Sequence, residues 1–266
     1  MSKKIFNYSI TKADEVKYGK EYTFTTISKT ELDSFNSDIL GLGNLDLDGE
    51  YFQVLSAILD LQGFTDFCNQ VDSHIVIPEF IDKFLNWLFQ KIKDISIAEQ
   101  KDTSVQLWQP LPFYAKFLGD GVLLLWDTAP LKGDIGALFN IVRLLINLTK
   151  FYTIDFYPEL KKQFSKPPSI LRCGVARGQV ISIGNGEDYI GSCINISARL
   201  QKISSLSFAV SRRGFDLKKT SNQSLNKELL SKKIKIRGIG EDELVYILKE
   251  EYDKLNAIEK SIFIDE

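Results

Sequence analysis

The sequence predicts one α+β domain in which helices pack on a mixed or largely antiparallel β-sheet. Three observations support this class. Short apolar runs that end at glycine are typical of buried strands, and longer segments with apolar residues on one face are typical of helices. Their order along the chain is strand, helix, hairpin, helix, hairpin, helix and further strands. With 266 residues, of which 44% are hydrophobic, the chain can bury a substantial core.

We expect three segments along the chain. Residues 1–50 are polar and rich in turn-forming residues, which indicates an N-terminal extension. Residues 51–250 carry the strand and helix patterns and are expected to form the folded domain. Residues 251–266 are charged and are expected to form a helical or frayed tail.

The first half of the domain begins with an apolar strand at 54–61. Thr65 and Asp66 can cap the helix that follows this strand. A long helix is expected at 75–92, because its apolar residues share one face. Those residues are Ile77, Ile81, Phe84, Leu85, Leu88 and Ile92.

A hairpin comes next, with strands at 113–118 and 122–126 joined by Gly119-Asp120-Gly121. Glycine on both sides of the acid permits a tight turn and leaves the carboxylate unobstructed. A helix is then expected at 135–152. Polar residues interrupt its apolar stretch, so we interpret it as a buried amphipathic helix rather than a membrane span.

In the second half, a further hairpin is expected from strands at 170–176 and 179–183, with its turn at Arg177-Gly178. Asn185-Gly186 turns the chain again before a short helix at 194–203. The remaining expected strands are 208–211, 233–236 and 244–248.

Composition argues against several classes of function. The net charge of −2 gives no global basic field that would attract nucleic acid. The three cysteines are widely spaced and form no CxxC motif, which argues against both a disulfide framework and a zinc site. The one histidine excludes zinc sites built on several histidines and argues against a histidine-activated nucleophile. The cysteine pattern fits a reducing cytosol, and the N-terminus has no apolar signal core, so a cytoplasmic location is expected.

Two acidic residues lie at the ends of apolar strands, and each has a glycine close by in the sequence. They are Asp60, in Leu59-Asp60-Leu61-Gln62-Gly63, and Asp120, between two glycines. Alone, each acid is more often a turn-former. If their strands lie side by side, both carboxylates meet at one end of the sheet, where they can bind two divalent ions on a polyphosphate. Oxygen ligands favour Mg²⁺ or Mn²⁺. The adjoining loop Gln62-Gly63-Phe64-Thr65 can aim backbone N–H groups at phosphate oxygens.

A third segment offers an amide and a guanidinium. Asn195 and Arg199 are four residues apart and project from one face of the expected helix. On their own, they could be a surface hydrogen-bonding pair. In a nucleotide site, Asn195 could orient a ribose, and Arg199 could stabilise negative charge on a reacting phosphate.

In this order, the segments resemble the class III nucleotide cyclases, the superfamily of adenylate and guanylate cyclase catalytic domains. Residues 59–65 resemble the family's Asp-Ile-x-Gly-Phe-Thr, and residues 116–121 resemble Lys-x-x-Gly-Asp-Gly. Residues 190–200 resemble Ile-Gly-x-x-Val-Asn-x-Ala-Ala-Arg-Leu, and residues 171–178 resemble the Gly-Ile-x-x-Gly strand pair. The resemblance runs from about residue 52 to 248, and the ordered set of blocks is its specific feature.

The resemblance implies a ferredoxin-like catalytic domain with a mixed, mostly antiparallel sheet flanked by helices. It also implies a head-to-tail homodimer with two composite active sites. One subunit would give Asp60, Asp120 and the Leu61 carbonyl to two Mn²⁺ or Mg²⁺ ions, and the other would give Asn195 and Arg199. The reaction would be attack of the ribose 3′-oxygen on the α-phosphate, which releases pyrophosphate and a 3′,5′-cyclic nucleotide.

The resemblance gives mixed indications on the base. Lys116 and Asp188 align with the two adenine-reading residues of adenylate cyclases, which favours ATP. In Arg237-Gly238-Ile239-Gly240, however, Ile239 replaces a lysine that contacts the triphosphate in the family. Arg237 or a neighbouring lysine would have to substitute for it.

A cyclase domain of this size without membrane or sensor domains resembles the pyrimidine cyclases of the Pycsar antiphage system. These make cyclic UMP or cyclic CMP, which switches on a separate effector protein. We therefore favour UTP or CTP as the substrate, with ATP as the alternative. Two other hypotheses are a nucleotide-sensing domain without catalysis, which the substitution at Ile239 favours, and a ferredoxin-like nucleic-acid-binding module. The sequence has neither an aromatic stacking signature nor a basic net charge that would support the nucleic-acid-binding module.

Overall fold

The computed structural model describes residues 9–12, 23–33, 49–70, 72–100, 102–131, 135–203, 205–214, 216 and 223–265. The chain divides into two compact units. The smaller unit comprises Met1–Tyr51 and Ile181–Ile190, and the larger comprises Phe52–Val180 and Gly191–Glu266.

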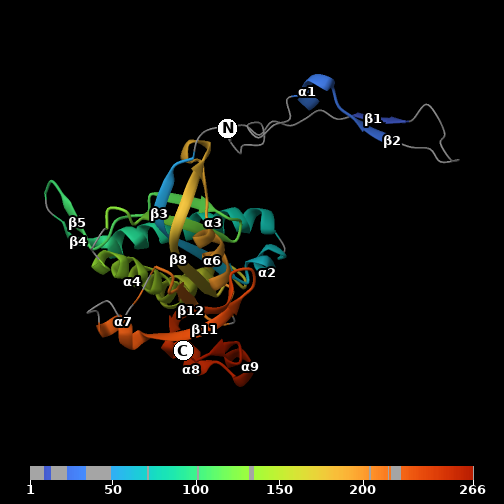
Figure 1. The fold of residues 1–266 in the computed structure, drawn as a ribbon. Coiled ribbons are helices and arrows are strands. Elements are labelled where there is room, and N and C mark those ends of the chain that lie inside the picture. Colours follow the sequence, from blue (N-terminus) through green and yellow to red (C-terminus); the bar gives the residue numbers. More distant parts are fainter. Residues whose placement is uncertain are drawn as a thin grey trace. The chain divides into compact units, whose positions relative to one another are not determined.

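The larger unit is built on a β-sheet with the strand order β13-β11-β12-β10-β8-β3-β7-β6, of which β3, β8, β11 and β12 are labelled in Figure 1. The strands are β3 (Tyr51–Gln62), β6 (Tyr114–Phe117), β7 (Gly121–Asp127), β8 (Ile170–Ile183), β10 (Phe208–Ser211), β11 (Leu229–Ile236), β12 (Gly240–Leu248) and β13 (Phe263–Ile264). β10 pairs with β8 in parallel, whereas the pairs β3/β7, β6/β7, β10/β12, β11/β12 and β11/β13 are antiparallel. This confirms the expected mixed, mostly antiparallel sheet. A separate antiparallel pair is formed by β4 (Ile97–Gln100) and β5 (Val105–Leu107).

Helices flank this sheet. They are α2 (Phe64–Cys68), α3 (Ser73–Ser96), α4 (Ile135–Phe151), α5 (Tyr157–Gln163), α6 (Ser192–Leu200), α7 (Gln223–Glu228), α8 (Lys249–Lys254) and α9 (Ala257–Lys260). A π-helical turn, η1 (Tyr152–Phe156), connects α4 to α5. Both predicted long helices are confirmed. α3 is longer than predicted at each end, and α4 continues through η1 into α5.

The two faces of the sheet have different roles. In β3, the side chains of Leu55, Ala57 and Leu59 join the main hydrophobic core, together with apolar side chains of α3 and α4. Because side chains alternate along a strand, Asp60 lies on the opposite face. That face carries α6, whose Ser197 hydroxyl donates a hydrogen bond to the Ser56 carbonyl oxygen at 3.0 Å. Asp60 of β3 and the candidate site residues of α6 therefore lie away from the main core.

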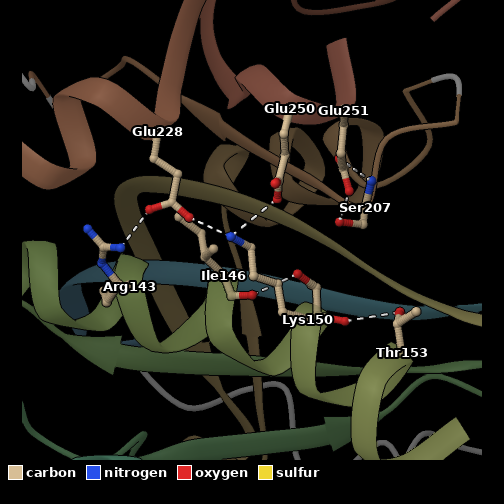
Figure 2. Close-up of polar contacts among 9 residues, drawn as sticks. Arg143, Ile146, Lys150, Thr153, Ser207, Glu228, Glu250 and Glu251 are labelled. Carbon is tan, nitrogen blue, oxygen red and sulfur yellow. Dashed lines mark hydrogen bonds and ion pairs between the residues drawn. The ribbon is translucent and has the colours of Figure 1, made fainter. Parts of the chain in front are cut away.

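An ion-pair network ties α7 and α8 to α4 (Figure 2). Glu228 accepts hydrogen bonds from Arg143 at 2.6 Å and from Lys150 at 2.7 Å, and Lys150 also lies 3.2 Å from Glu250. Burial lowers the pKa of Lys150, but the two carboxylates more than offset this effect, so its pKa is raised. Lys150 is therefore charged at neutral pH.

One helical stretch in the described part of the chain, Gly136–Gln163, is long and apolar enough to cross a membrane by length and composition alone. Of its most apolar window, 61% is buried inside the protein. Residues of α4 such as Ile141, Leu145 and Leu148 are fully buried. The core helix of a globular protein meets the same criteria, and burial is what the sequence predicted for this segment.

The smaller unit contains several local structures. β1 (Ser9–Lys12) pairs antiparallel with β2 (Thr23–Thr26), and α1 spans Lys29–Asp33. The end of β8 turns through a 3₁₀ segment, η2 (Gly184–Gly186), and pairs with β9 (Asp188–Ile190).

Residue 50 is tied to this β8–β9 hairpin. The Ser182 amide donates to the Glu50 carbonyl oxygen at 2.9 Å, and the Glu50 amide donates to the Ser182 hydroxyl at 2.9 Å. The end of the predicted extension is thus joined to the hairpin by two hydrogen bonds.

Two local predictions are wrong. The expected hairpin at 170–183 is one continuous strand, β8. Gly178 marks a close approach rather than a turn, because a Cβ there would lie 3.0 Å from the Cβ of Cys193 in α6. The expected capping by Thr65 or Asp66 is also absent. α2 starts after Gly63, whose φ of 88° favours glycine, and no side chain caps this helix.

The C-terminal tail contains more structure than the sequence indicated. The expected helical character is present in α8 and α9, and the chain then forms β13. β13 pairs antiparallel with β11, so residues at this end extend the sheet.

Candidate functional site

The two predicted acidic residues lie at the same end of neighbouring strands. β3 and β7 pair with Asp60 opposite Gly121, and the Leu61 amide donates to the Asp120 carbonyl oxygen at 2.9 Å. Glycine is required beside Asp120. A Cβ at Gly121 would lie 2.1 Å from the Leu59 carbonyl oxygen, and Gly119 has a φ of 92°.

Asp60 is buried and paired with an arginine that the sequence reasoning did not select. The residue is only 5% exposed, and its carboxylate accepts hydrogen bonds from Nε of Arg172, at 3.1 Å, and from Nη2 of the same side chain. Arg172 stands in β8 between the buried Leu171 and Cys173. An arginine in such an apolar strand is itself a signal for an acidic partner.

Asp120, in contrast, is exposed and makes no ion pair within the described residues. Burial, and then the charge of Asp120, raises the pKa of the Cys68 thiol in α2. The Asp120 carboxylate thus lies near α2, and Cys68 is neutral at pH 7.

The acidic pair has the ligand chemistry for a hard divalent cation. Two carboxylates against the one guanidinium of Arg172 leave a net negative charge. Within the described residues, no group of three or more His, Cys, Asp or Glu side chains could hold a metal ion. The other ligands would therefore be oxygens of the Leu61 carbonyl, water and phosphate, which suits Mg²⁺ or Mn²⁺. On this donor set, Asp60, Asp120 and Leu61 fit the ions that the sequence analysis expected.

The other residues expected near the acidic pair have different environments. The Phe64 ring is buried and packs 6.1 Å from Phe67 and 6.0 Å from Phe80, centroid to centroid. Its side chain therefore belongs to the core. Thr65 is exposed in α2. Lys116 is half-buried in β6 and lies opposite Leu123 of β7.

α6 is pressed against β8. A Cβ at Gly174 would lie 2.1 Å from the Ser197 carbonyl oxygen and 2.4 Å from the Gln201 amide nitrogen. The Ser197 side chain is buried and bonded to β3, as described above. Because these contacts fix the inner face of α6, the outer face presents Asn195 and Arg199 to solvent.

Asn195 and Arg199 line a pocket of about 450 Å³. The pocket lies between α6 and the turn that joins β11 to β12, in which the Ile239 amide donates to the Ile236 carbonyl oxygen at 2.9 Å. The lining residues are Asn195, Ala198, Arg199, Lys202, Arg237, Gly238 and Ile239. The structure thus brings together the predicted Asn195, Arg199 and Arg237.

The same pocket also contains a residue that the sequence reasoning missed, Lys202. No carboxylate is among its lining residues, which include neither Asp60 nor Asp120. Asp60 and Asp120 therefore lie outside the pocket that Asn195 and Arg199 line. Lys202 closely follows α6, and helical periodicity places it beside Arg199, a signal that the sequence did contain.

Asp188, the remaining predicted site residue, lies in β9 of the smaller unit. Its carboxylate accepts a hydrogen bond from the Tyr189 amide at 2.9 Å. Lys116 belongs to the larger unit, so the two expected base-reading residues occupy different units.

No protein-family model matches the sequence, and no curated protein matches it significantly. Solved structures do resemble it. The adenylyl cyclase CyaB from P. aeruginosa has a TM-score of 0.55 and 14% sequence identity, over 76% of this chain and 96% of that chain. The guanylyl cyclase Cya2 has a TM-score of 0.45 and 17% identity, over 76% of this chain and 94% of that chain. The first similarity shows the fold: a mixed α+β domain with the architecture of class III cyclase catalytic domains.

Proposed function

We propose that this protein is a nucleotide cyclase that converts a nucleoside triphosphate, with UTP or CTP favoured, to the 3′,5′-cyclic monophosphate and pyrophosphate. The cyclic nucleotide would be a second messenger for a separate effector protein in antiphage defence, made in the cytoplasm. The choice of a pyrimidine and the defence role rest on the resemblance to Pycsar cyclases.

The observation that carries the proposal is the register of β3 and β7. It brings Asp60 and Asp120 to one end of the sheet, while Asn195 and Arg199 line a separate cationic pocket. A nucleotide needs both groups at once, because its phosphates bind metal and its ribose must be oriented. A head-to-tail homodimer would meet this need by joining the acidic pair of one subunit to the pocket of the other.

In such a site, each side chain has a defined task. Asn195 would hydrogen-bond the ribose and hold its 3′-oxygen in line with the α-phosphate. Arg199 would stabilise the charge that develops on the α-phosphate. Asp60, held by Arg172, and Asp120 would bind two Mn²⁺ or Mg²⁺ ions with the Leu61 carbonyl. When bound, these ions neutralise phosphate charge and lower the pKa of the attacking hydroxyl.

The remaining predicted residues would contact the substrate. The backbone of Phe64 and Thr65 would face phosphate oxygens, because the Phe64 ring is occupied by core packing. Arg237 would bind the polyphosphate from the far side of the pocket. The new bond joins the 3′-oxygen to the α-phosphorus, and the bond to pyrophosphate breaks. The 3′-hydroxyl proton passes to solvent water.

ATP is the alternative substrate. Lys116 and Asp188 have the residue types and sequence positions of adenine readers, which is the specific observation in its favour. Incubation of the purified protein with each of the four NTPs and Mn²⁺, followed by chromatography of the products, tests the choice. We expect a cyclic pyrimidine nucleotide and pyrophosphate.

Other products would select among the hypotheses. Cyclic AMP alone would refute the pyrimidine preference and leave the cyclase proposal standing. Tight NTP binding without turnover would refute catalysis and support a nucleotide-sensing domain.

A further inference from the structure

The residues that line the pocket beside α6 carry a net positive charge. Arg199, Lys202 and Arg237 all line it, and all three are exposed. Within the described residues, none of their side chains makes an ion pair, and the pocket lining holds no carboxylate. Three positive charges around one hollow create a local positive potential that favours a multiply charged anion.

Lys202 is held in place by its neighbours. Its amide donates to the Arg199 carbonyl oxygen at 3.1 Å, which continues the helical turn beyond the end of α6. The flanking Gln201 and Ile203 are only 5% and 6% exposed. Their burial fixes the backbone around Lys202, whose side chain lines the pocket.

We propose that Lys202 is a phosphate-binding residue, whose ammonium group holds the polyphosphate of the nucleotide in this pocket. The inference rests on the proposed function for the identity of the ligand. On the opposite wall, Ile239 supplies no charge, so Lys202 and Arg237 provide the cations beyond Arg199. A polyphosphate has enough oxygens to contact all three cations at once.

The test uses the full-length protein and inorganic triphosphate as the probe, with affinity measured by calorimetry at low salt without divalent ions. We expect Lys202→Gln to weaken binding about tenfold, as for the loss of one charge-assisted hydrogen bond. Lys202→Arg keeps the charge and should retain most of the affinity. Lys93→Gln is the matched control, because Lys93 is exposed at the end of α3.

Unchanged affinity in Lys202→Gln would overturn the proposal, and so would an equal loss in Lys202→Arg, because charge would then not be the cause. The NTP assay separates this proposal from the proposed function. Lys202-dependent triphosphate binding without cyclic product would leave the anion site standing and refute the cyclase. Cyclic product with an unchanged KM and triphosphate affinity in Lys202→Gln would do the reverse.

Discussion

Asp60 and Arg172 form a buried pair whose members depend on each other. The Asp60 side chain is 7% exposed and the arginine side chain 19% exposed, so neither charge is fully hydrated. Pairing offsets the cost of burying them, and removing one partner leaves the other uncompensated. The pair therefore links the stability of the sheet to the acidic end of the candidate site.

We expect Arg172→Met to lower the free energy of unfolding by about 3 kcal/mol, because it leaves the Asp60 carboxylate buried without a partner. Adding Asp60→Asn to this variant should recover part of the loss. Denaturant unfolding of both single variants and the double variant measures the coupling. Strictly additive losses would contradict a direct interaction.

At the scale of elements, the contact between α6 and β8 determines where the pocket lies. Gly174 admits α6 to the strand because a side chain there would meet backbone atoms. Gly178 lies four residues further along the same strand, and its nearest neighbours are the side-chain atoms of Cys193 in the same helix. Alanine substitutions at these two glycines can therefore be compared directly, because both positions face α6 from the same strand.

Gly174→Ala should destabilise the protein by about 2 kcal/mol, because the helix has to move away from the strand. Gly178→Ala should cost less, since a side chain yields more easily than backbone. Thermal and denaturant unfolding compare the two variants. An equal or larger loss in Gly178→Ala would contradict the assigned packing.

Glu251 of α8 makes a pH-dependent contribution to the stability of the folded protein (Figure 2). Burial raises its pKa above the ordinary value of 4.5, although hydrogen bonds from Ser207 oppose this shift. The folded protein therefore holds this proton more tightly than the unfolded chain. The resulting stabilisation is present below about pH 4.5 and is lost as the pH rises through the raised pKa.

We expect Glu251→Gln to remove this dependence. The stability of the variant relative to wild type should rise as the pH increases from about 4.5 towards neutrality. Denaturant unfolding at several pH values measures the difference. A difference that stays constant, or that falls with pH, would show that Glu251 does not carry the effect.

The elements also show how far the sequence predicts this structure. Apolar runs predicted β3 and the β6/β7 hairpin, in which β3 and β7 are buried on both faces, and apolar periodicity predicted α3 and α4. It failed at β8, where Gly178 serves contact with α6 and not a turn. The reason is that a glycine in sequence does not reveal whether it bends the chain or admits a neighbour.

The site was predicted in a similar way. Asp60 and Asp120 were selected from their glycine context, and the pairing of β3 with β7 puts both residues at the same end of the sheet. The sequence marks Arg172 as an arginine in an apolar strand and Lys202 as a lysine three residues after Arg199, but it does not reveal the tertiary neighbours of either residue. The neighbour of Arg172 is Asp60, and that of Lys202 is the β11/β12 turn.

At the scale of the whole molecule, the proposed site needs two copies of the chain. Asp120→Asn and Arg199→Ala would each inactivate a homodimer. In a co-expressed mixture, about half of the dimers pair one variant with the other, and each has one intact site, so about a quarter of wild-type activity should return. Cyclic-nucleotide production by the co-purified mixture measures this.

A mixture of Asp120→Asn with Asp60→Asn is the control, because both changes affect the same half of the site. It should remain inactive. Activity in the control, or none in purified dimers of Asp120→Asn with Arg199→Ala, would exclude a site shared between subunits.

The close contact between α6 and Gly174 limits how this protein could be regulated. With no space between helix and strand, α6 cannot tilt or slide by itself, and its polar outer face travels with the sheet as one rigid body. In the proposed homodimer, a signal that tunes the proposed reaction would then act by moving one protomer against the other.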